Sequence, residues 1–158
     1  MVELREATPD DLDAVLAVHR DAIRSIATDR YTEEEREVWA AAQNDPGQYP
    51  VDEDTQYLAV AETAGDRIVG FVGLDLEDGV VETLYVDPTL HGEGIGTKLL
   101  THAETMLQAH DHDQCVMAAS LNSVPFYQRQ GYRVEDETFS VEMADTHLEF
   151  IRMEKSLG

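Results

Sequence analysis

The sequence predicts a single mixed α/β domain around a largely antiparallel sheet, and three observations carry that prediction. The chain has 158 residues, which is the size of one domain with a core of its own. Segments with the alternating pattern of strands are interspersed with segments whose apolar residues recur at helical spacing. No internal repeat, linker or low-complexity stretch divides the chain, so we expect one domain over residues 1–158.

The first half of the chain predicts a strand, two helices and a hairpin. The expected elements are a strand over 2–7, a helix entered at 8–11 and continuing to 26, a helix over 32–39, and strands over 57–62 and 67–75. Pro9 and Thr32, the latter ahead of three glutamates, are typical of helix starts. Polar residues 43–55 predict a loop, and residues 64–66 a hairpin turn.

The second half of the chain predicts the rest of the sheet and two helices. The expected elements are strands over 79–86, 114–121, 132–142 and 147–155, and helices over 95–109 and 123–130. In the longer helix, Ile95, Leu99 and Ala103 fall on one face, as expected of a helix packed on a sheet.

Three glycines at alternate positions lie between the strand over 79–86 and the helix that follows it. Gly92, Gly94 and Gly96 have no Cβ, so the backbone can turn tightly and present N–H groups to an anion. The helix adds its unpaired first-turn donors and the positive end of its dipole. This predicts a phosphate or pyrophosphate site, the alternative being a Gly-rich turn without a ligand. Thr97 stands where a dinucleotide fingerprint or a Walker loop needs glycine, so both are excluded.

A second motif follows the apolar run 115–119. Together the two motifs resemble the GNAT superfamily of acyl-CoA-dependent N-acetyltransferases, and the resemblance runs nearly end to end. The family's pyrophosphate loop has Gln or Arg, two residues, Gly, one residue, then Gly or Ala, and residues 91–96 match it with His91 at the first position. The family's later motif, Asn, then Phe-Tyr, then Gly-aromatic, is matched by Asn122, Phe126-Tyr127 and Gly131-Tyr132.

The resemblance implies acetyl-CoA as co-substrate and a fold in which the strands before the Gly loop and after its helix splay apart. The acyl arm would lie between them, and one backbone N–H of residues 84–86 would polarise the thioester carbonyl. The implied cofactor-binding residues are Leu84, Tyr85, Val86, His91, Gly92, Glu93, Gly94, Ile95, Gly96, Thr97, Asn122, Tyr127 and Arg129.

Two residues are the candidates for proton transfer. Strand alternation predicts that Glu82 shares a face with Leu84 and Val86, and relatives often use a strand carboxylate here as base through a water. The alternatives are a solvated charge at a strand end, or a base at Asp75 or Glu149. Tyr127 falls on the family tyrosine whose hydroxyl approaches the cofactor sulfur, which makes it the candidate acid. The alternative is a core aromatic residue.

The sequence contains less evidence for an acceptor pocket, and none for a metal site. The resemblance places an acceptor pocket near Tyr31, Trp39, Asp75 and the loop 43–55, although helical spacing also fits Trp39 in the core. The histidines show no metal-ligand spacing, so we expect no metal.

The chain is strongly acidic, with 33 Asp and Glu against 11 Lys and Arg and a net charge of −22. Such a charge disfavours nucleic acid and anionic membranes as partners. Because the acidic residues are spread over every segment, we favour a protein of a salt-rich cytoplasm, the alternative being an acidic face for a cationic substrate. No apolar run spans a membrane and no signal pattern is present, so we expect a cytoplasmic location. Self-repulsion also predicts that affinity for anionic coenzyme A rises from low to molar salt, as a titration at each salt concentration would show.

The predicted function is acetyl transfer from acetyl-CoA to a primary amine by direct attack in a ternary complex. The acceptor is a small metabolite, an antibiotic-like amine, or a protein N-terminus or lysine. A non-catalytic acyl-CoA-binding module of the same fold is the alternative. The loop spacing weakens a third reading, a nucleotide-binding protein. The sequence does not determine the oligomeric state, and a homodimer is one possibility.

Overall fold

In the computed structural model of the chain, the described residues are 2–158; Met1 of the expected domain and the side chains of Asp136 and Glu137 lie outside this description. The strands are β1 (Val2–Glu6), β2 (Gln56–Thr63), β3 (Ile68–Asp75), β4 (Val80–Val86), β5 (Gln114–Ser120), β6 (Arg133–Met143) and β7 (Thr146–Ser156). The helices are α1 (Leu12–Arg24), α2 (Glu33–Ala42), α3 (Ile95–Ala109) and α4 (Val124–Arg129).

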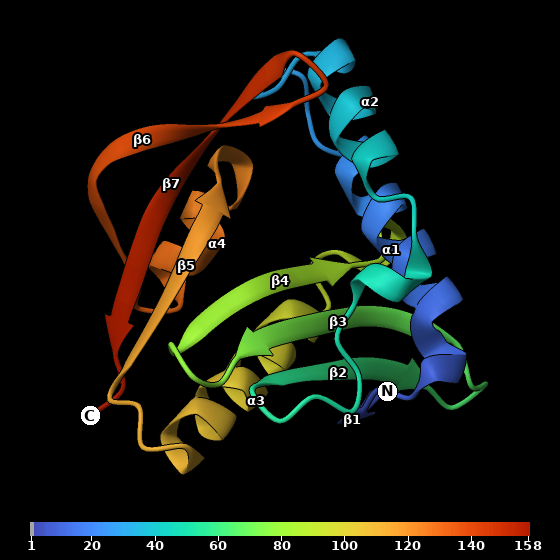
Figure 1. Ribbon diagram of the computed structural model, residues 1–158, viewed down its shortest axis with the longest axis vertical. Coiled ribbons are helices and arrows are strands. Elements are labelled where there is room, and N and C mark those ends of the chain that lie inside the picture. The colour runs from blue at the N-terminus through green and yellow to red at the C-terminus, as the bar shows by residue number, and fades with distance from the viewer. Residues whose placement is uncertain (1) are drawn as a thin grey trace.

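The strands form one seven-stranded sheet with the order β1-β2-β3-β4-β5-β7-β6 (Figure 1). Neighbouring strands are antiparallel except for the central pair, β4 and β5, which is parallel. The predicted mixed α/β domain with a mostly antiparallel sheet flanked by helices is confirmed.

The central pair of strands separates soon after it forms. The backbone ladder joins Val80 to Val116 and Val81 to Met117, and beyond these pairs β4 and β5 diverge (Figure 1). The closed end is held by Gly79, whose carbonyl accepts a 3.2 Å hydrogen bond from the N–H of Val116. The expected splay is therefore present, and it leaves the later halves of β4 and β5 without each other as partners.

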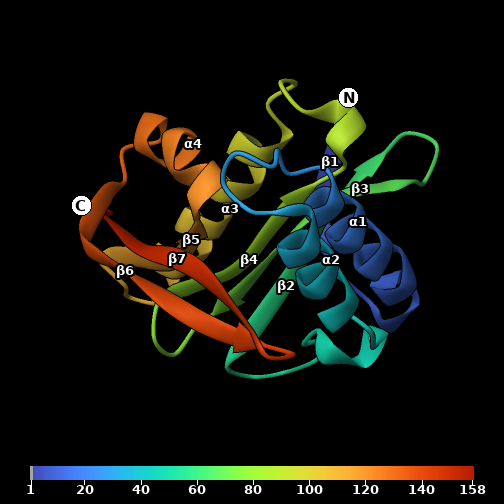
Figure 2. The same ribbon diagram turned by 90° about the horizontal axis from the view of Figure 1, so that it is seen from above.

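The helices cover both faces of the sheet, with α1 and α2 on one side and α3 and α4 on the other (Figure 2). On the α3 side, buried Leu99 and Leu107 pack with Val72 of β3. On the α1 side, Val15 packs with Phe71, the preceding residue of the same strand. We call these the α3 face and the α1 face. Among the described residues, no helix combines the length and the apolar character that crossing a membrane requires.

The helix-start signals in the sequence correspond to real caps. Thr32 and Glu35 form a reciprocal capping box, in which the Thr32 hydroxyl accepts from the N–H of Glu35 at 3.1 Å. The helix expected over 95–109 coincides with α3. The helix expected over 123–130 is shorter, because residues 121–123 form a 3₁₀ turn and α4 begins at Val124. Inside the expected loop 43–55, residues 46–48 form another 3₁₀ turn.

Candidate active site

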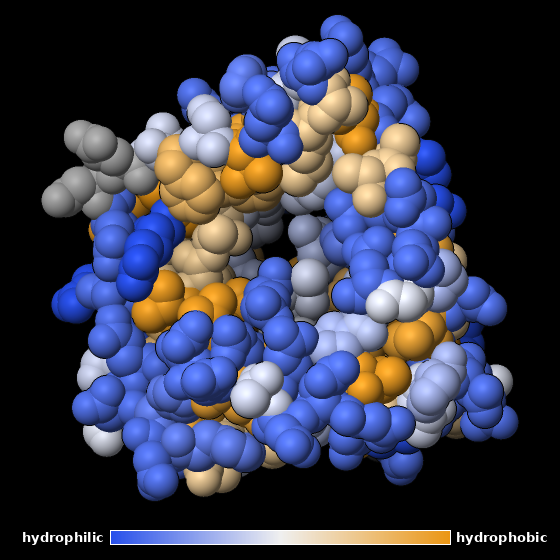
Figure 3. Space-filling model, viewed as in Figure 1, coloured by the Kyte–Doolittle hydropathy of each residue, from blue (hydrophilic) through white to orange (hydrophobic). Residues whose placement is uncertain are grey.

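The divergence of β4 and β5 opens a cavity of about 630 Å³. Its walls are residues 84–86 of β4 and residues 118–120 of β5, the halves of the two strands that no longer pair with each other. The space-filling view shows an opening over this part of the molecule, between the strands β5 to β7 and the helices α1 and α2 (Figure 3). Strand separation therefore exposes backbone N–H and C=O groups inside a hollow, where a ligand can use them.

The Gly loop forms one end of the cavity, and its glycines are needed for two different reasons. Gly92 and Gly94 have φ angles of +87° and +83°, and a Cβ on either would meet nothing within 4 Å. Their requirement is conformational, and the space beside them is open for a ligand. Gly96 has no such angle; a Cβ there would come within 3.3 Å of the ring of Phe126, so this glycine allows α3 to pack against α4.

The loop points the start of α3 into the cavity. Gly94 is the N-cap residue of the helix, and the N–H of Lys98 donates to the Gly94 carbonyl at 3.0 Å. The N–H groups of the first turn before Lys98 have no partner within the helix. Ile95, Gly96 and Thr97 of this turn line the cavity. The arrangement is suited to bind a phosphate-bearing ligand through backbone donors and the helix dipole.

Positive side chains contribute sparingly. His91 and Arg129 line the cavity. Among the described residues of its lining, Arg129 is the only lysine or arginine. The Lys98 ammonium instead donates to the carbonyl of Val2 at 3.1 Å, away from the cavity. Glu93, expected at the cofactor, is exposed and does not line the cavity. The remaining cofactor-binding residues expected from the sequence all lie on the cavity wall, while their roles stay predictions.

Tyr127 reaches the cavity from α4 and is 7% exposed. Its ring packs edge-on against Phe126, with centroids 5.1 Å apart, and against Tyr132 at 5.8 Å. Burial raises the pKa of the Tyr127 phenol well above its ordinary value, with smaller contributions from Tyr85 and Cys115. Tyr127 therefore stays protonated at neutral pH and can donate a proton or a hydrogen bond into the cavity.

Asn122 lines the cavity from the turn between β5 and α4, and Tyr31 holds that turn in place. The Tyr31 hydroxyl accepts from the N–H of Leu121 at 2.9 Å and donates to the carbonyl of Glu149 at 2.5 Å. It thereby joins the turn to β7. This role was not evident from the sequence, because the partners are 90 and 118 residues away.

Tyr31 and Trp39 do not lie where the sequence analysis expected them. They are 2% and 3% exposed and belong to a buried cluster with Phe150, so neither lines the cavity. The Trp39 ring stands edge-on to Phe150 with centroids 5.4 Å apart. We therefore correct the expectation that these two side chains contact an acceptor: they pack α2 and the segment before it against β7, and burial leaves them almost no accessible surface for a ligand.

A β-bulge changes the position of Glu82. Gly73 of β3 pairs with Thr83 while the next residue, Leu74, pairs with Val81, so Glu82 is an extra residue without a partner. Val81 and Leu84 both pack on the α3 face although three positions separate them. The bulge therefore reverses the alternation, and the expectation that Glu82 shares a face with Leu84 and Val86 was wrong.

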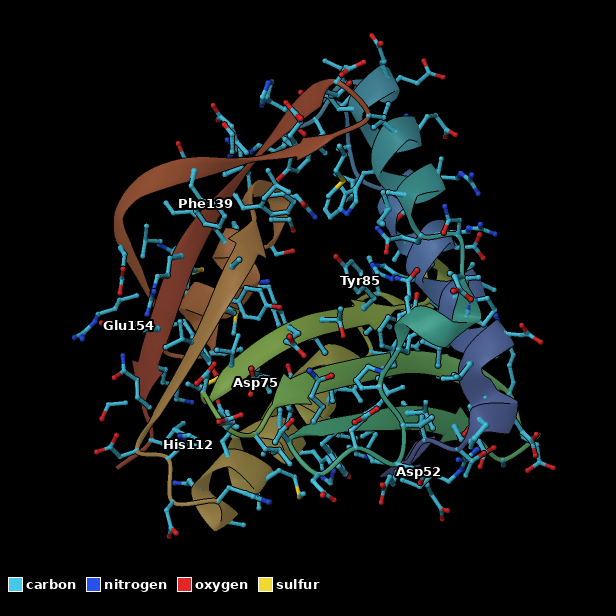
Figure 4. All side chains as sticks on the ribbon, in the orientation of Figure 1. Asp52, Asp75, Tyr85, His112, Phe139 and Glu154 are labelled. Carbon is cyan, nitrogen blue, oxygen red and sulfur yellow. The ribbon has the colours of Figure 1, made fainter. Side chains whose placement is uncertain are left out.

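On the α1 face, Glu82 lies near Asp75. Partial burial raises the pKa of the Glu82 carboxyl, and the charge of Asp75 raises it further. Figure 4 shows Asp75 on the lower side of the central opening and Tyr85 on its right side. Neither carboxylate lines the cavity itself, and Glu82 is exposed, as is Glu149, the other base considered. Glu82 and Asp75 therefore form an acidic pair outside the cavity, on the face that carries α1.

The structure adds cavity residues that sequence reasoning missed. The end of α1 and the segment after it contribute four of them: Ala22, Ser25, Ile26 and Ala27. Ser120, Ser123 and Gln130 extend the wall around Asn122 and α4. Small residues near a helix end carry no local signal, because their proximity to β4 depends on how α1 packs on the sheet. The described residues hold no group of His, Cys, Asp and Glu that could bind a metal ion.

The chain is similar to N-acetyltransferases in sequence. Residues 27–157 match the family model described as Acetyltransferase (GNAT) domain. Peptidyl-lysine N-acetyltransferase YjaB of Salmonella typhimurium is 35% identical over 77 residues, which is 49% of this chain and 50% of that protein. An uncharacterized N-acetyltransferase of Archaeoglobus fulgidus is 32% identical over 111 residues, 65% of this chain and 71% of that protein. The chain thus matches about half the length of the first relative.

The chain is also similar to solved structures over nearly its whole length. A GCN5-related N-acetyltransferase from Rhodopseudomonas palustris superposes with a TM-score of 0.89 at 28% identity, covering 99% of this chain and 96% of that one. PaiA N-acetyltransferase from Thermoplasma acidophilum, in complex with coenzyme A, has a TM-score of 0.77 at 25% identity and covers 99% of both chains. A protein with this fold therefore binds coenzyme A.

Proposed function

The chain belongs to the GNAT acetyltransferase family, and from this premise we propose that it transfers the acetyl group of acetyl-CoA to a primary amine in a ternary complex. The observation that carries the proposal is the divergence of β4 and β5 at the start of α3. It brings three features to one cavity of about 630 Å³: strand backbone that is unpaired on the edge facing the cavity, Tyr127, and a glycine cradle, by which we mean the loop 92–94 with the first turn of α3. A thioester carrying a pyrophosphate needs these three features together.

The cradle fits the pyrophosphate of acetyl-CoA on steric and electrostatic grounds. Positions for a Cβ on Gly92 and Gly94 are open, so the ligand can approach the backbone directly. First-turn N–H groups of α3 would bind the phosphates, and Arg129 would supply positive charge. The backbone of residues 84–86 would bind the pantetheine arm, and one of its N–H groups would stabilise the developing oxyanion.

Two proton transfers accompany the reaction. The acceptor arrives mostly as an ammonium ion, and Glu82 would remove its proton through a water. The neutral nitrogen then attacks the thioester carbon, so that an N–C bond forms and the C–S bond breaks. The Tyr127 phenol would donate to the departing sulfur, and the second proton that the nitrogen loses as the amide forms would return to the phenolate through water. The raised pKa of Tyr127 keeps this donor protonated, and the acidic pair on the α1 face favours a cationic acceptor.

Release of free thiol from acetyl-CoA, measured with a panel of primary amines in molar salt, tests this function. Amine-dependent release is expected, with the acetylated amine identified by mass spectrometry. Calorimetric binding of acetyl-CoA without thiol release from any amine would support the non-catalytic acyl-CoA-binding module instead. We place the reaction in a salt-rich cytoplasm, because the acidic residues are spread over every segment of the chain. The acceptor would be a small-molecule or peptide amine.

A further inference from the structure

An aromatic side chain is exposed beside the opening that leads to the cavity. Phe139 of β6 is 41% exposed, and among the described residues it is the exposed large apolar residue that carries an aromatic ring. Its ring lies 6.3 Å from that of Phe150, its cross-strand partner on β7. Figure 4 shows Phe139 on the upper left of the central opening, across from Tyr85.

Strand pairing shows which residues share this face with Phe139. Phe150 lies opposite Phe139 on one side and opposite Ser120 of β5 on the other, so the three side chains point to the same face. Exposed Ala118 lies two positions earlier on β5, on that same face. The space-filling view shows apolar atoms along this side of the opening, over β5 to β7 (Figure 3). An apolar wall therefore borders the opening on one side.

The other sides of the opening are different. Tyr85 packs against the buried cluster that contains Phe150 and also lines the cavity, so it lies where the opening meets the cavity. Its ring is fixed by His19, with centroids 4.2 Å apart, and His19 is in turn hydrogen-bonded to the Tyr49 hydroxyl at 2.8 Å. Asp75, with Glu82 nearby, contributes negative charge below the opening (Figure 4).

We propose that the acceptor is a primary amine with an aromatic or branched aliphatic group attached close to the nitrogen, and that Phe139 determines this preference. The apolar group packs on Phe139 and the neighbouring face of β5, and the ammonium nitrogen points from there toward the side of the opening that carries the negative charge of Asp75 and Glu82. This inference rests on the proposed function, since it identifies the substrate class of the same site. Charge complementarity excludes an apolar acid, and the exposed ring accounts for the apolar group.

The test compares 2-phenylethylamine with ethanolamine, two primary amines of similar basicity. The wild-type protein is expected to show a kcat/KM for 2-phenylethylamine about tenfold or more above that for ethanolamine, the usual scale of an added apolar contact. Phe139→Ser is expected to remove most of this difference, mainly through KM, while the value for ethanolamine stays unchanged. Phe139→Leu should restore part of the preference, because it restores an apolar surface.

Val134→Ser is the matched control. Val134 lies on the same strand and is 37% exposed, but it pairs with Met153, which packs on the α3 face. The control is expected to leave both amines unaffected. Equal rates for the two amines in the wild type, or equal losses in Phe139→Ser and Val134→Ser, would overturn the proposal.

A binding measurement separates this inference from the proposed function. Calorimetric titration of 2-phenylethylamine into the wild type and Phe139→Ser, each saturated with coenzyme A, requires no turnover. Weaker binding to the variant supports the apolar wall even if no amine releases thiol, in which case the acetyltransferase proposal alone fails. Unchanged binding contradicts the wall even if acetyl transfer to other amines is observed.

Discussion

The two sides of the splayed sheet are built in different ways. On the α3 side, the cradle comes from one continuous stretch from β4 to the first turn of α3, and its binding groups belong to the backbone. On the α1 side, the features around the opening are side chains from separate strands: Asp75 of β3, Glu82 and Tyr85 of β4, and Phe139 of β6. A backbone site tolerates sequence change as long as its glycines remain, whereas a side-chain site changes with every substitution. We therefore expect cofactor binding and acceptor chemistry to be separable by mutation.

The largest effect is expected in the cradle, where Gly94→Val should abolish measurable acetyl-CoA binding. The φ angle of +83° strains a β-branched residue, and the new side chain would occupy the open space beside the backbone. Calorimetry measures the binding, and circular dichroism checks that the domain stays folded. Gly131→Val is the control, because Gly131 has a similar φ of +96° but does not line the cavity. If Gly94→Val binds like the wild type, the cradle does not bind the cofactor.

On the α1 side, Glu82→Gln should leave acetyl-CoA binding intact and lower the rate at neutral pH by about 10²–10⁴-fold, the usual contribution of a general base. Because burial and Asp75 raise the pKa of Glu82, its carboxylate forms at higher pH than an ordinary glutamate. The wild-type rate therefore rises with pH as Glu82 loses its proton, and this rise is absent in the variant. The loss shrinks at high pH, where the amine is already neutral.

A pH-rate profile of Glu82→Gln beside Glu77→Gln, an exposed carboxylate in the turn before β4, makes the assignment specific. A defect of the same size at every pH would point to lost acceptor binding instead of lost base catalysis. An unchanged rate would transfer the role to another group, for which Asp75, the carboxylate that acts on Glu82, is the next candidate.

Tyr127→Phe is expected to lower kcat and kcat/KM together by roughly 10- to 1,000-fold, less than a general acid can contribute, because a thiolate leaves readily without help. The ring keeps its packing on Phe126 and Tyr132, so the melting temperature and cofactor affinity should change little. Single-turnover kinetics measure the chemical step. An unchanged chemical step would make Tyr127 a packing residue.

The smallest effect is expected at Tyr31, which joins the turn after β5 to β7. Tyr31→Phe leaves the N–H of Leu121 and the carbonyl of Glu149 without their partner, at a cost of about 1–3 kcal/mol in unfolding free energy. The loosened turn should also weaken acetyl-CoA binding modestly, through Asn122. Tyr49→Phe is the control, since it loses its 2.8 Å bond to His19 but does not touch this turn. Equal cofactor affinity in the two variants would limit Tyr31 to stability.

Features that depend on neighbouring residues could be predicted from the sequence, whereas features that depend on distant residues could not. The boundaries of α3, the capping box at Thr32 and the positions that need glycine follow from residues within one turn of each other. The splay was expected through the family resemblance, and the two pairs that join β4 to β5 show where it begins. These features depend on backbone conformation, which neighbouring residues control directly.

Local sequence could not predict the placement of Glu82, Tyr31 and Phe139. The face of Glu82 depends on a bulge opposite Gly73 and Leu74, and alternation alone gave the wrong face. The sequence predicted that Tyr31 lies in the acceptor pocket, whereas in the structure its hydroxyl is hydrogen-bonded to the backbone of Leu121 and Glu149, which are far away in the sequence. The sequence did not predict that Phe139 is exposed, because an isolated aromatic residue in a strand is usually part of the core.

By itself, then, the sequence determined the strands, the helices and the glycine cradle, because each depends on backbone geometry within a few consecutive residues. Tertiary structure alone decided which side chains face the opening. That outcome depends on strand register, one bulge and the packing of α1 and α2 on the sheet, all of which join residues far apart in the chain. A shift of one residue in register moves a side chain to the other face, and no local pattern records it.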